Sequence, residues 1–62
     1  MRQVWNDKQN QNYGVELVKD CTSNTWEVVL YSMYGKTLEV KKYYSKESAK
    51  SGFYRMCKKN NI

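Results

Sequence analysis

Apolar and polar residues alternate through the first half of the chain. From Tyr13 to Val18 every second residue is large and apolar, and Thr25–Ser32 is rich in aromatic and β-branched residues. Such period-two patterns predict strands. A third strand is predicted over 36–43, after a turn in which Gly35 is free to adopt positive φ. In the second strand one face carries Trp26, Val28 and Leu30, and the other carries Glu27, Val29 and Tyr31.

In the third predicted strand, the apolar pair sets the direction of the side chains. Leu38 and Val40 are expected to point inward, because they are its large aliphatic residues. The residues between them are then expected to point outward, namely Thr37, Glu39, Lys41 and Tyr43.

After Tyr44 the spacing of apolar residues changes to a helical one. Ser45 is a favourable N-cap and Glu47 would lie in the first turn, where the helix dipole favours an acid. The pattern predicts a helix over 46–59, which must pack on the sheet because so short a helix is marginal alone. Gly52 falls beside the apolar residues of this helix and would allow the helix to approach the strands closely. The apolar stripe consists of Ala49, Phe53, Met56 and Cys57.

These elements predict an α+β fold, a three-stranded antiparallel meander with one C-terminal helix packed on one face (βββα), spanning 13–62. Residues 1–12 are mostly polar and have no sustained period, which predicts an N-terminal arm. Trp5 in this arm either docks on the core or stays free for a partner. Docking is favoured, because an exposed indole lowers solubility.

Charge is distributed unevenly along a chain whose net charge is +5. Residues 1–35 carry three basic and four acidic side chains, whereas residues 36–62 carry eight basic and two acidic ones. The positive field of the C-terminal half favours an anionic partner. A domain of 62 residues is also marginally stable, so a dimer contact or a bound partner would add to its stability.

Little in the sequence favours catalysis. There is no histidine, the six acids form no pair suited to acid and base chemistry, and the glycines are isolated. Cys21 and Cys57 are expected to be reduced thiols, with Cys57 in the core. We therefore expect no enzyme, no catalytic residue, no metal, no cofactor and no small-molecule substrate. With no stretch suited to a signal peptide or a membrane span, the expected location is cytoplasmic.

Cations recur every four residues along the predicted helix. Such a stripe would track the phosphates of DNA or RNA with little sequence specificity. The alternative is that a small domain simply keeps the outer face of its helix charged and solvated. The nucleic-acid-binding set predicted from this spacing, extended into the preceding strand, is Lys46, Lys50, Tyr54, Arg55, Lys58, Lys59, Lys41 and Lys42.

The run from Trp26 through "GKTLEVKKYYSKESAKSGF" resembles the arm-type DNA-binding domains of phage and transposon integrases. It is also similar to a short bacterial repeat of the YegP type, through Tyr44–Lys46, Ser51, Gly52 and Lys58–Asn60. Both resemblances imply the same fold. The first also implies DNA binding, and the second implies no activity.

The integrase resemblance implies that DNA is read by the exposed face of the sheet. Three acids, Glu16, Glu27 and Glu39, are expected on that face, where they would repel phosphates. The same face would hold an apolar patch typical of a protein contact or a homodimer seam. A second hypothesis is therefore a protein-binding module, such as a phage-type inhibitor or regulator of a larger host complex, acting through Val18, Val29, Tyr31 and Tyr43.

Overall fold

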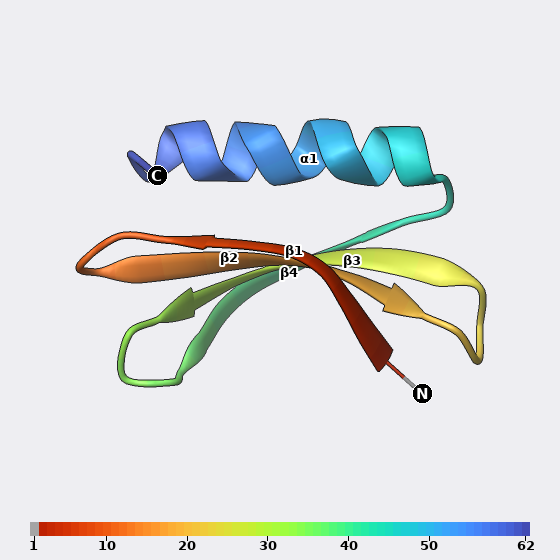
Figure 1. Ribbon diagram of the computed structural model, residues 1–62, viewed down its shortest axis with the longest axis horizontal. Helices are drawn as coiled ribbons and strands as arrows, with labels where there is room; N and C mark the ends of the chain where they lie inside the picture. The colour runs from red at the N-terminus through yellow and green to blue at the C-terminus, as the bar shows by residue number, and fades with distance from the viewer. Residues whose placement is uncertain (1) are drawn as a thin grey trace.

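A computed structural model describes residues 2–62, which form one antiparallel sheet and one helix (Figure 1). The strands are paired in sequence order, β1-β2-β3-β4, so the sheet is a meander. The helix α1 lies along one face of the sheet, and no helix covers the other face (Figure 1). The elements are β1 (Arg2–Gln9), β2 (Tyr13–Asp20), β3 (Thr25–Ser32), β4 (Thr37–Tyr43) and α1 (Lys46–Lys59).

The prediction of three strands preceded by an arm is wrong, because residues 2–9 pair with β2 as a fourth strand. All but one of the residues of β1 are exposed, so this edge strand has no buried face that would require apolar alternation. The pairing also shifts between Val4 and Asn6, where Trp5 forms a bulge. Both features hide the strand from a search for period-two hydrophobicity.

The core lies between α1 and the inner face of β2 and β3. Phe53, Val15 and Val28 are completely buried, and the predicted two faces of β3 are confirmed because Trp26, Val28 and Leu30 all join this core. The helix has the predicted bounds, and its predicted apolar stripe is buried. The Ser45 hydroxyl accepts a hydrogen bond of 3.2 Å from the Ser48 N–H, as an N-cap should.

The predicted directions in β4 are reversed from Glu39 to Tyr43, whereas Thr37, which pairs with Tyr31 beyond a register shift, lies on the open face as predicted. Val40 pairs with Val29 on the face that the helix does not cover and is 50% exposed, while Tyr43 pairs with Trp26 and packs against the core. The Tyr43 ring lies where a side chain at position 52 would be, so Gly52 permits this contact. The apolar character of Leu38 and Val40 was misleading, because β4 is an edge strand that contributes one aromatic ring to the core.

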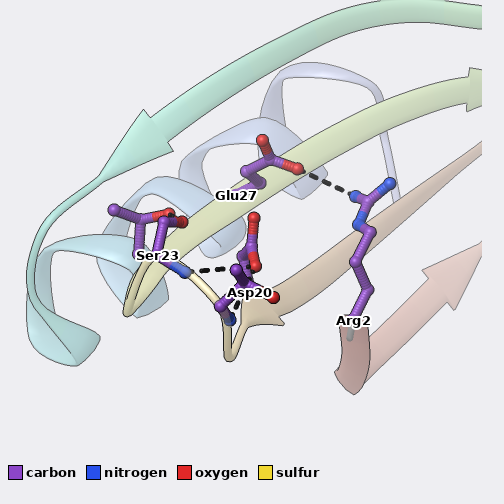
Figure 2. Close-up of polar contacts among 6 residues, drawn as sticks. Arg2, Asp20, Ser23 and Glu27 are labelled. Carbon is purple, nitrogen blue, oxygen red and sulfur yellow. Dashed lines mark hydrogen bonds and ion pairs between the residues drawn. The ribbon is translucent and has the colours of Figure 1, made fainter.

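Polar contacts tie the outer parts of the fold together. Figure 2 shows the Arg2 guanidinium donating to the Glu27 carboxylate at 2.8 Å, which links β1 to β3 across β2. In the turn after β2, the Asp20 carboxylate accepts hydrogen bonds from the backbone N–H groups of Thr22 and Ser23. The bond from Thr22 is the main reason that the pKa of Asp20 lies below its ordinary value. Within the described residues, the helix is not long and apolar enough to span a membrane.

Candidate functional site

Cations lie on both flanks of α1. On the flank next to β1, Lys46 and Lys50 line a hollow of about 210 Å³ together with Trp5 and Tyr54. The Lys46 ammonium stands 4.7 Å from the centroid of the Trp5 ring, and the Lys8 ammonium stands 5.5 Å from that of Tyr54. The aromatic rings of this flank therefore already carry cations of the same chain.

Trp5 docks on the fold, as favoured from the sequence. Its ring meets the Trp26 ring edge to face, with centroids 4.8 Å apart. The side chain remains 45% exposed, since the edge strand β1 leaves its outer side open to solvent.

The flank next to β4 holds a larger groove, of about 390 Å³. Its floor includes the buried Met56 and the half-buried Tyr43. One of its cations comes from the strand and the rest from the helix, and the four are Lys41, Arg55, Lys58 and Lys59. The geometry thus joins an apolar floor to a cationic rim.

Charges are segregated between the two sides of the sheet. The strand pairing and the cation–ring contacts place eight of the eleven basic residues on the helix side, and these are Lys8, Lys19, Lys41, Lys46, Lys50, Arg55, Lys58 and Lys59. Among residues 2–62, two acids share that side, Glu39 on β4 and Glu47 on α1. The open face carries more acids than bases, with Asp7, Glu16, Asp20 and Glu27 against Arg2 and Lys42.

The cations of α1 are not neutralised within the part of the chain that the structure describes. Among residues 2–62 the ion pairs within 4.0 Å are Arg2 with Glu27 and, at 3.8 Å, Lys41 with Glu39. The helix cations thus keep their charge available to an anionic partner.

The predicted nucleic-acid-binding set is divided by the sheet. All its members on α1 stay on the helix side, and Lys41 joins them because its partner on β3 is the buried Val28. Lys42 is separated from them, since it pairs with Glu27 on the open face. Lys8 and Lys19 join the helix side without having been predicted. The direction of Lys19 could be inferred from the sequence, because it lies two residues after the inward-facing Leu17 and therefore on the same face of β2. Lys8 lies on a strand with no such pattern.

The open face retains most of the predicted protein-interface residues. Val18, Val29 and Tyr31 lie there, but the placement of Tyr43 on this face is wrong, as its ring faces the helix. Glu39 was also expected there and instead lies on the helix side, because it pairs with the core residue Leu30. Val4 and Val40 add half-exposed aliphatic surface that the sequence did not point to, at 55% and 50%.

The Tyr31 side chain organises one end of the open face. Its ring lies over Gly14 of β2, and its hydroxyl donates a hydrogen bond of 3.0 Å to Asp7 Oδ1 of β1. Burial, and secondarily the neighbouring Asp7 carboxylate, raise the pKa of Tyr31. Three strands are thus linked by one side chain.

The two cysteines lie in different surroundings. Burial among apolar side chains raises the pKa of the Cys57 thiol, which disfavours the thiolate. Cys21 is exposed in the turn after β2. Within residues 2–62 no three Cys, Asp or Glu side chains are grouped so that they could hold a metal ion.

Comparisons with protein-family models, with curated proteins and with solved structures found no match to this chain. The resemblances to integrase arm-type domains and to the YegP-type repeat therefore stay predictions.

Proposed function

We propose that this protein is a small, non-enzymatic, cytoplasmic binding module that contacts the backbone of nucleic acid with the helix side of its fold. The observation that carries the proposal is the segregation of charge, with eight cations and two acids on the helix side. The residues that carry it are those of the two flanks of α1, namely Lys41, Lys46, Lys50, Arg55, Lys58 and Lys59.

The electrostatic argument depends on the position of the acids. A helix whose charge served solubility alone would be expected to carry both signs, as most surfaces of small domains do. Here four of the six acids lie on the opposite face of the sheet, and α1 carries one acid, Glu47, against five cations. A phosphate backbone approaching α1 would therefore meet mainly attractive charges, with little base specificity.

The test is a fluorescence anisotropy titration with single- and double-stranded oligonucleotides across a range of salt concentrations. For each phosphate neutralised, the logarithm of the binding constant should fall with the logarithm of salt at a slope of about −0.9 for duplex and about −0.7 for single strands. We expect a slope that corresponds to several phosphates for both forms. An affinity that salt does not change, or no binding at low ionic strength, would contradict the proposal.

A second function is favoured by the half-exposed aliphatic side chains of the open face. Val4 and Val40 lie beside the buried Val18 and Val29, which together form an apolar patch with charged residues around it. This surface suits a protein contact, either a second copy of the chain or a larger complex that the module inhibits or regulates. Sedimentation equilibrium tests the first case, because a Val40→Asp change should weaken self-association without unfolding the protein. A wild-type chain that stays monomeric at high concentration would exclude the homodimer.

A further inference from the structure

We propose that the groove between β4 and α1 seats one unpaired nucleotide of a single-stranded nucleic acid, its base on the floor and its phosphates on the rim. The proposal rests on the proposed function, because it specifies how the same basic side of the molecule engages its partner. It adds two preferences to the proposed function: single strands should bind more tightly than duplex, and strands with bases should bind more tightly than an abasic backbone.

The groove has the size and chemistry of a site for a small flat molecule with negative charge. Its volume of about 390 Å³ falls in the range of roughly 300–1,000 Å³ typical of small-ligand pockets. Met56 and the Tyr43 ring provide apolar contact for a base, and Arg55, Lys58 and Lys59 lie beside them to meet phosphate. Binding to backbone alone would need no hollow with an aromatic wall.

The Tyr43 ring differs from the Trp5 and Tyr54 rings on the other flank of α1. Cations of the chain lie over Trp5, Trp26 and Tyr54, whereas within residues 2–62 none is found over Tyr43. The ring is also held in place by its contact with Gly52 of the helix. A fixed ring that no cation of the chain covers is a favourable stacking surface for a base, because little ordering is needed on binding.

The position of the groove favours an unpaired nucleotide. A base within a duplex is stacked and paired, so seating it would require flipping it out of the helix. A single strand exposes its bases already. Lys41 forms the strand side of the rim, and the neighbouring Glu39 carboxylate, 3.8 Å from its ammonium, leaves Arg55, Lys58 and Lys59 as the main phosphate contacts.

The experiment compares two oligonucleotides of equal length and charge, oligothymidylate and an abasic analogue that keeps every phosphate. Base–aromatic stacking predicts that oligothymidylate binds at least about fivefold more tightly at the same salt concentration. Thymidine monophosphate should displace it only in large molar excess, because it brings the base without the neighbouring phosphates. Equal affinities for the two oligonucleotides would overturn the groove proposal while leaving backbone binding intact. If neither oligonucleotide binds, both the groove proposal and the proposed function are overturned.

Two tyrosine variants locate the base. Tyr43→Leu should remove the difference between the two oligonucleotides, whereas Tyr34→Leu, in a fully exposed turn residue, should preserve it. Circular dichroism shows whether each variant is folded. If Tyr43→Leu does not fold, photo-crosslinking of wild-type protein to a strand containing 4-thiothymidine replaces it. Crosslinks at Tyr43 or Met56 are expected, and crosslinks confined to the open face or to Trp5 would contradict the proposal. A monophosphate that binds as tightly as the strand would show that the ligand is a free nucleotide instead.

Discussion

The two faces of the sheet are built from the same strands but differ in burial and in charge. On the covered face Val15 and Val28 are fully buried, whereas on the open face Val4 and Val40 are about half exposed, at 55% and 50%. The cations gather around the covered face and the acids around the open one. The completely buried side chains and the positive potential therefore lie on one side of the molecule, whereas the open face combines the buried Val18 and Val29 with half-exposed neighbours.

This asymmetry matters because the domain is small. At roughly 0.05–0.15 kcal/mol per residue, a chain of this length has a free energy of unfolding of about 3–9 kcal/mol. A single large loss on the covered face therefore approaches the whole stability of the fold. The truncation of a half-exposed side chain on the open face should lower the free energy of unfolding much less.

The largest expected effect is that of Phe53→Ala, which removes a completely buried ring from the core. Such truncations cost about 3–5 kcal/mol, so the variant should lose a large part of its stability and unfold at a much lower urea concentration than wild type. Val40→Ala is the control on the open face and should cost less than about 1 kcal/mol. Urea unfolding followed by circular dichroism measures both. Equal losses would show that the open face is also part of the stabilising core.

A smaller effect is expected from placing the same methyl group on each side of the sheet. The added Cβ of Gly52→Ala would overlap the Tyr43 ring, which is confined between helix and sheet. The strain should lower the free energy of unfolding by about 1–3 kcal/mol. The higher helix propensity of alanine should return about 1 kcal/mol of this loss.

The matching change on the open face is Gly14→Ala, whose Cβ would overlap the Tyr31 ring. No helix covers this ring, so it can turn into solvent with the loss of its hydrogen bond to Asp7, worth about 1 kcal/mol. Alanine in a strand is more favourable than glycine by about 0.5–1 kcal/mol, because glycine loses more conformational freedom on folding, and this gain nearly offsets the loss of the hydrogen bond. A Gly14→Ala variant less stable than Gly52→Ala would contradict this ranking.

Tyr31 also links the open face to pH. Its pKa is raised in the folded state, so the stability that depends on its neutral form is complete below the ordinary value of 10.0 and is lost as the pH rises through the folded value. Tyr31→Phe cannot ionise, and its melting temperature should fall less steeply than that of wild type above this pH. Parallel curves for the two proteins would contradict the assignment.

The smallest effect is expected for the pair that joins β1 to β3. Arg2 is 58% exposed, and exposed ion pairs contribute between about zero and 1 kcal/mol. Arg2→Ala should lower stability by no more than that, and the loss should shrink as salt is added. Thermal melts of both proteins at low and high salt measure it. A loss comparable to that of Phe53→Ala would mean that β1 is held mainly by this contact.

The parts of the fold that could be predicted are those with one buried face. In β3 and α1 the side chains that enter the core are large and regularly spaced, so the strand at 25–32, the helix at 46–59 and its Ser45 cap follow from the pattern. The edge strands could not be predicted so well. β1 has almost no buried residue to mark it, and β4 sends Tyr43 into the core in place of Leu38 or Val40.

The same difference explains what the sequence missed in the candidate site. Helical spacing alone grouped the cations of α1, because neighbours on a helix are set by sequence. Whether Lys41 or Lys42 joins them depends on the phase of β4, which is fixed by the packing of Tyr43 on Gly52. Lys8 is brought beside Tyr54 only by the pairing of β1 with β2.

The central claim is that the helix side, not the open face, contacts nucleic acid, and a matched pair of charge reversals tests it most directly. Lys50→Glu with Lys58→Glu alters the helix, while Lys36→Glu with Lys42→Glu alters the β3–β4 turn and the open face. Each pair lowers the net charge of +5 by the same four units. Measured by anisotropy at one low salt concentration, the helix pair should abolish binding and the control pair should retain most of it. Equal weakening by both pairs would contradict the claim, since binding would then follow net charge alone.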